Sequence, residues 1–253
     1  MNNLRKIGLS ALAGSLATFS VNAADVSVSG GASITFDDSN RGKGDRGNGF
    51  YMGDSLKFNM SGETDGGIGI AVYYEIDGGA LDDYNLKMSG DWGSLTFDGH
   101  GGSSAFGAID DKTPNAYEEA WAVVDTDGTS ATGSATVING AGGNNMFIYT
   151  SPSMGGAVFS AAYVNHVSAA AESYMDYSVV LSDLADGLSI GAGLADHTTA
   201  SASSTDVEES TIYATYAVGS MTVGVQFSDY DHDTANSDQE STAIGISYAV
   251  NDD

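Results

Sequence analysis

Side chains alternate between apolar and polar along most of the sequence, and this period of two constrains the fold more than any other feature. In the segment that ends at Phe36, for example, Val26, Val28 and Ile34 alternate with serine and threonine. Residues two apart lie on the same face of a β-strand, so each such segment predicts a strand with one apolar and one polar face. Twelve strands are expected, at 26–36, 55–61, 68–76, 84–88, 95–97, 144–151, 157–166, 175–181, 188–194, 212–218, 221–227 and 244–250, with the facing of the sixth and seventh left open.

The connections between the expected strands alternate in length. Tight turns such as 63–67 and 219–220 follow the even-numbered strands, whereas long polar stretches such as 38–53 and 99–143 follow most of the odd-numbered ones. A soluble β-sandwich has no reason to keep short connections at one end and long ones at the other. An outer-membrane barrel does, because its turns are short on one side of the membrane and its loops are long on the other.

The composition of the two faces also favours a membrane barrel over a secreted sandwich or solenoid, which is the alternative. The apolar face carries Val, Ile, Leu, Met, Phe and Tyr, and the polar face carries mostly Ser, Thr, Gly, Asn and Lys. A barrel in lipid turns its apolar side chains outward and closes the sheet, so that no backbone edge meets hydrocarbon. The predicted fold class is therefore an all-β, antiparallel transmembrane β-barrel.

Charge and composition exclude several other classes. The chain has 8 Lys and Arg against 34 Asp and Glu, a formal net charge of −26, which excludes a nucleic-acid partner because phosphate contacts need clustered cations. It has no Cys, so neither a disulfide framework nor a thiolate metal site is expected. Beyond the first segment, no apolar run approaches the roughly 20 residues of a membrane helix.

The first 23 residues have the pattern of a cleaved export signal. Arg5 and Lys6 precede an apolar stretch, 7–21, which ends in the small-residue triplet Val21-Asn22-Ala23. We expect cleavage after Ala23, leaving 24–253 as the barrel outside the cytoplasm. An uncleaved N-terminal membrane anchor is the alternative, and the stretch is short for it.

Two segments resemble the general diffusion porins of Gram-negative bacteria, in particular their small alphaproteobacterial branch. They are 93–99 (GSLTFDG), which leads into 104–110 (SAFGAID), and the hairpin 212–223 (IYATYAVGSMTV). The resemblance spans Asp25 to Asp253 and is one of pattern and loop layout. It implies a non-enzymatic, water-filled channel for ions and small hydrophilic solutes in the cell outer membrane. It also implies a trimer of 16-stranded barrels, each with its third external loop folded into the lumen.

The end of the sequence differs from that family pattern. The family's chains end in a strand with a terminal aromatic residue, whereas this sequence ends in Asn251-Asp252-Asp253 after the twelfth expected strand. Because a sheet in lipid must close to remove its edges, we expect a C-terminally truncated barrel that lacks about four strands.

The longest connection, 99–143, is the counterpart of the pore-constricting third loop. A stretch of this length without a strand pattern points to function or disorder, and a solvated external loop is the alternative. Its position after the fifth strand favours a loop folded into the lumen. The acidic residues that we expect at the constriction are Asp110, Asp111, Glu118, Glu119, Asp125 and Asp127, against a single Lys112.

Basic residues on the barrel wall oppose such a loop in the family. Here the candidates are Lys57 and Lys87, because each lies on the polar face of an expected strand. The alternative for each lysine is an ordinary ion pair with Glu75 or Asp98. With Lys112 included, three lysines face six acids, so we expect a local charge of −3 and weak selectivity for cations. No arginine lies in any expected strand, which puts a strong transverse field in doubt.

Other chemistry is weakly signalled. No serine, histidine or acid is singled out by a catalytic motif, so no catalytic residue, metal site or cofactor is expected. The acidic run Asp229–Asp233 offers at most weakly bound Ca²⁺, because it lacks the ligand spacing of a dedicated loop. Two alternatives from other classes stay open: a hydrolase with its site at the barrel rim, and a structural or adhesive β protein.

Overall fold

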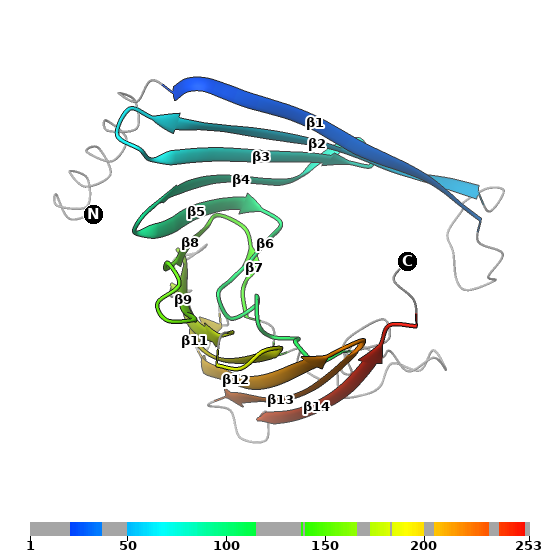
Figure 1. Ribbon diagram of the computed structural model, residues 1–253, viewed down its shortest axis with the longest axis vertical. Helices are drawn as coiled ribbons and strands as arrows, with labels where there is room; N and C mark the ends of the chain where they lie inside the picture. Colours follow the sequence, from blue (N-terminus) through cyan, green and yellow to red (C-terminus); the bar gives the residue numbers. More distant parts are fainter. Residues whose placement is uncertain are drawn as a thin grey trace. The chain divides into compact units, whose positions relative to one another are not determined.

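The computed structural model describes residues 21–36, 50–114, 138, 140–165, 173–182, 184–199, 205–232 and 238–250. It divides into two compact units, Met1–Asp91 and Trp92–Asp253, which Figure 1 colours from blue to cyan-green and from green to red. The described residues are mostly strand. They contain no helix that is long and apolar enough to cross a membrane.

The first unit is an antiparallel sheet whose four strands pair in chain order. These strands are β1 (Val21–Phe36), β2 (Phe50–Thr64), β3 (Gly69–Asp77) and β4 (Ala80–Gly90). Glycines make the tight turn between β3 and β4 possible, because Gly78 and Gly79 have φ of 57° and 82°, which other residues rarely adopt. At the β2–β3 turn, the Ile68 N–H donates to Thr64 Oγ1 at 3.1 Å.

The second unit contains eight further strands that pair antiparallel with their neighbours. They are β5 (Gly93–His100), β8 (Met146–Thr150), β9 (Ala157–Val164), β10 (Tyr174–Leu181), β11 (Leu188–Thr199), β12 (Thr205–Val218), β13 (Met221–His232) and β14 (Gln239–Tyr248). Two short strands, β6 (Gly102–Ser103) and β7 (Gly142–Gly143), pair with each other in a separate ladder.

Burial in these sheets is the reverse of that in a water-soluble protein. Large apolar side chains are exposed on one face: Ile34 is 79% exposed and Ile244 is 81% exposed. The buried side chains include many polar ones, such as Asp176 at 0% and Gln226 at 1%. We call the apolar face the outer face and the polar face the inner face. An apolar outer face is stable only against lipid or another apolar surface.

The twelve expected strands are present, and the strand prediction is confirmed. The facing of β8 and β9, which the sequence left open, is settled by Phe147 and Phe159, which are exposed on the outer face. The short β6–β7 pair was not predicted, because two residues give no periodicity. Of the expected signal peptide, residues 1–20 lie outside the described residues and Val21–Ala23 begin β1, so cleavage after Ala23 stays a prediction.

Candidate functional site

A segment of the long connection after β5, residues 104–114, lies against the inner face of β10 to β14. In Figure 1 its green trace leaves β6 and runs along the concave side of the sheet toward β12 and β13. We call it the wall segment. Two turns compact its start, because the Ala108 N–H donates to the Ser104 carbonyl at 2.9 Å and the Ile109 N–H to the Phe106 carbonyl at 2.8 Å.

Asp176 on β10 holds the start of the wall segment. Its carboxylate accepts hydrogen bonds from the backbone N–H groups of Ala105 at 3.1 Å and Phe106 at 3.0 Å. The Tyr174 hydroxyl donates to the same carboxylate at 2.7 Å. Three donors stabilise a buried charge that would otherwise be costly, and hydrogen bonds to an ionised acceptor are among the strongest in proteins.

Gln226 on β13 holds the end of the wall segment. Its Oε1 accepts from the Lys112 N–H at 2.8 Å, and its Nε2 lies 2.8 Å from the Ile109 carbonyl oxygen and 2.7 Å from that of Asp110. The same nitrogen lies 2.8 Å from Thr211 Oγ1 on β12. One amide therefore ties three backbone groups of the loop to the wall, which a carboxylate or an alkyl side chain cannot do.

The returning part of the connection is held in the same way. The Gly140 N–H donates to Glu209 Oε2 on β12 at 3.1 Å, and the Ala141 N–H donates to the Tyr174 hydroxyl at 3.0 Å. Gly140 has φ of 64°, and a Cβ there would lie 2.8 Å from Ser104 Oγ, so both its conformation and its surroundings require glycine.

Apolar packing supports these hydrogen bonds. Phe106 is fully buried, and its cluster contains Ile138, Tyr174, Ala195, Val207 and Tyr230. The inner face of this unit is therefore polar by composition but has a small apolar core where the wall segment covers it. Burying a Phe side chain contributes about 1.5–3 kcal/mol, which favours attachment of the segment over its release into water.

Glycines on the inner face let the segment approach the sheet closely. A Cβ on Gly193 of β11 would lie 2.9 Å from Ile109 Cδ1, and one on Gly224 of β13 would lie 2.7 Å from Pro114 Cδ. On β14, a Cβ on Gly245 would overlap the Pro114 carbonyl oxygen. These glycines leave the space that the segment fills.

Only part of the predicted constriction lies in the described residues. Asp110 and Asp111 are half-buried on the wall segment, and Lys112 beside them is exposed. The other four predicted acids, Glu118, Glu119, Asp125 and Asp127, lie outside the described residues. The constriction as a whole therefore stays a prediction.

The predicted wall lysines lie in the first unit. Lys57 on β2 pairs with Glu75 on β3, with Nζ 3.3 Å from Oε1, and the Tyr73 hydroxyl donates to the other carboxylate oxygen. This ion pair is the one that the alternative interpretation of Lys57 expected. Lys87 on β4 is exposed. Whether either lysine faces the loop acids stays a prediction.

The residues that hold the loop, namely Asp176, Glu209 and Gln226, were not predicted from the sequence. Each lies at an inner-face position within a strand, and its neighbours in the sequence face outward, as Met175 and Tyr177 do on either side of Asp176. The sequence did contain a signal, because an acid or amide at an inner-face position is costly to bury without a hydrogen-bond partner. The sequence does not say which partner it has.

The family to which the chain belongs is decided by comparison with known proteins. The family model described as Gram-negative porin matches residues 8–253. The chain belongs to the Gram-negative porin family. A search of curated individual proteins found no match. Membership in this family agrees with the inside-out burial and places the protein among outer-membrane channel proteins.

Solved structures support the porin fold. OmpT, an outer membrane protein of Vibrio cholerae, aligns with a TM-score of 0.63 and 11% identity, over 92% of this porin and 73% of that chain. Its trimer form aligns with a TM-score of 0.58 and 13% identity, over 91% and 74%. The anion-selective porin from Comamonas acidovorans aligns with a TM-score of 0.54 and 19% identity, over 90% and 75%. The predicted all-β, antiparallel outer-membrane barrel class is confirmed.

Proposed function

We propose that this porin forms a water-filled channel through which ions and small hydrophilic solutes diffuse passively, with a weak preference for cations. The observation that carries the proposal is the attachment of the connection to the inner face by three buried side chains. Asp176 and Gln226 hold the wall segment, and Glu209 holds the returning part at Gly140. A loop fixed inside a barrel narrows the path, and the charges that it carries act on every ion that passes.

The charge of the loop supports the preference for cations. Asp110 and Asp111 lie on the fixed part of the connection, and the residues after Lys112 include no lysine or arginine. Carboxylates in a narrow, water-filled path attract cations, and a low-dielectric wall concentrates their potential. This effect acts within a Debye length, about 8 Å at physiological salt, so it weakens in a more saline medium.

The reversal potential in a planar bilayer under a tenfold KCl gradient tests the preference. An ideally cation-selective pore gives about 59 mV, and we expect a smaller value of the same sign. The variant D110N/D111N/E118Q/E119Q should move the potential toward zero, because amides keep the shape of the side chains and remove four charges.

A matched variant separates local charge from net charge. D196N/E208Q/D229N/D231N removes the same number of charges from the outer face, and it should leave the reversal potential unchanged. An anion-directed potential in the unmodified porin, or equal shifts in both variants, would contradict control by the loop.

Three finer points belong to the same proposal. We propose a homotrimer in outer-membrane lipid, which native mass spectrometry of the purified porin tests. We also propose cleavage after Ala23, which N-terminal sequencing of the exported chain tests.

A passive channel has no catalytic step and needs no cofactor or Ca²⁺, so ester or peptide hydrolysis by the purified porin, or loss of conductance in EDTA, would contradict it.

A further inference from the structure

The outer face of β9 to β14 carries a groove that the channel does not use. Its volume is about 590 Å³, within the roughly 300–1,000 Å³ of small-molecule sites. Its floor is formed by Ala192 on β11 and Ser210 on β12, two small residues of the outer face. One side is formed by Phe159 and Tyr177, whose rings stack with their centroids 6.2 Å apart.

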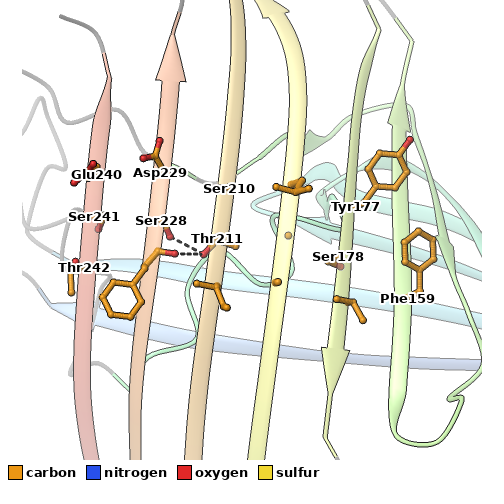
Figure 2. A pocket seen from close by; sticks show the side chains of 16 residues that line it. Phe159, Tyr177, Ser178, Ser210, Thr211, Ser228, Asp229, Glu240, Ser241 and Thr242 are labelled. Atoms are coloured by element: carbon orange, nitrogen blue, oxygen red, sulfur yellow. Dashed lines mark hydrogen bonds between the residues drawn. The ribbon is translucent and has the colours of Figure 1, made fainter.

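The strand registers arrange the outer-face residues in rows that run across the sheet. One row is wholly apolar up to its last residue and consists of Phe159, Val179, Ala192, Ile212, Phe227 and Thr242. The next row, one step along the strands, turns from apolar to acidic and consists of Tyr177, Leu194, Ser210, Asp229 and Glu240. The groove therefore begins on an apolar surface and ends at carboxylates. In Figure 2, Asp229 and Glu240 lie side by side on neighbouring strands, on the opposite side of the view from Phe159 and Tyr177.

A second hollow of about 540 Å³ continues the acidic end. It shares Tyr177, Leu194, Ser210 and Asp229 with the groove and adds Asp196, Glu208 and Asp231 to the lining. Glu208 lies directly opposite Asp196 on one side and Asp231 on the other, and Asp229 lies opposite Glu240. Like charges placed opposite each other across strands are destabilising. A cation bound beside them relieves that repulsion.

The chain itself supplies no lysine or arginine for this role after Lys112. Along β12, β13 and β14 the carboxylates follow the apolar side chains of the outer face. In membrane barrels the apolar band ends where the polar headgroups begin. A ligand that fills both parts must have an apolar chain and a positively charged head. A primary ammonium group fits best, because it is compact and can donate three hydrogen bonds to carboxylates.

We propose that this groove binds a membrane amphiphile with one alkyl or acyl chain and a primary-amine headgroup. The chain lies over Ala192 and Ser210, against Phe159 and Tyr177, and the ammonium group lies among Glu208, Asp229 and Glu240. The inference rests on the membrane-spanning fold and is independent of the proposed cation preference.

Native mass spectrometry of the full chain in neutral detergent with EDTA tests the inference. The probe is hexadecylamine, and hexadecanol and hexadecanoic acid have the same chain with other heads. We expect one hexadecylamine per chain, with a half-saturating concentration at least about tenfold below that of hexadecanol, since a charge-assisted hydrogen bond supplies that factor. Ala192→Phe should abolish binding by filling the floor.

The variant E208Q/D229N/E240Q tests whether these carboxylates bind the ammonium headgroup. It does not endanger the fold, because amides remove the repulsion between carboxylates on neighbouring strands. It should bind hexadecylamine no better than hexadecanol, whereas D54N, which removes an exposed carboxylate from β2, should bind as the unmodified chain does. Equal binding of amine and alcohol would overturn the inference, as would an amine preference that survives the triple variant. Tighter binding of hexadecanoic acid after Ca²⁺ addition would overturn it too, in favour of a metal-bridged anion. The single-channel conductance of the triple variant should be unchanged, so failure here is separable from failure of the channel proposal.

Discussion

Replacing Asp176 with Ala should detach the start of the wall segment while leaving the sheet intact. The carboxylate accepts two loop N–H groups at 3.1 and 3.0 Å, and both lie in a region where the surrounding side chains are buried. A buried donor that loses its partner costs about 1–3 kcal/mol, so two of them weaken the attachment by about 2–6 kcal/mol. A segment held by a few kcal/mol is then released in a large fraction of molecules.

Limited proteolysis and single-channel recording measure this release. We expect faster cleavage within the 99–143 connection and a larger, noisier conductance in D176A, because the detached loop moves in and out of the path. S178A is the matched control: Ser178 is the next inner-face residue on β10, it is also buried, and it takes no part in the loop contacts described above. If D176A showed the same cleavage rate and conductance as S178A, the attachment of the loop by Asp176 would be refuted.

Three further substitutions test neighbouring parts of the account. Q226E replaces an amide donor with a carboxylate that faces two carbonyl oxygens, and proteolysis should show release of the loop at a cost of at least about 2 kcal/mol. G245A should displace the loop through its new Cβ and lower the melting temperature, whereas G31A, where a Cβ meets nothing within 4 Å, should not. K57M removes a half-exposed partner of Glu75 and should lower the free energy of unfolding in a chemical-denaturation series by less than about 1 kcal/mol. A loss above about 3 kcal/mol would mean that the ion pair is effectively buried.

The strands and their facing were predictable from the sequence because one strong physical pattern encodes them. Side chains two apart share a face, so Met175, Tyr177 and Val179 had to lie together, and they do. Lipid outside a barrel favours this pattern, since side chains that face hydrocarbon are mostly apolar. Where the pattern was faint, as at β8 and β9, the strands were placed and their facing was left open.

The attachment of the loop was not predictable in the same way. Asp176, Glu209 and Gln226 bind backbone N–H and carbonyl groups, which are the same in nearly every residue and leave no mark on the sequence. The sequence distances between the partners, for example 70 residues from Phe106 to Asp176, exceed any local pattern. Acids in the loop could be counted from the sequence, but their fixed positions depend on these long-range contacts.

The most direct test of the account is chemical modification of Asp111→Cys in an open channel. The chain has no Cys, so the new thiol is the only target for a charged, membrane-impermeant methanethiosulfonate reagent. If Asp111 lies in the ion path, a positively charged reagent should lower the single-channel current in steps and shift the reversal potential toward anions, and Asp231→Cys on the outer face should show neither effect. Complete modification of the Asp111→Cys thiol without any change in current would contradict the central claim that this loop lines the channel.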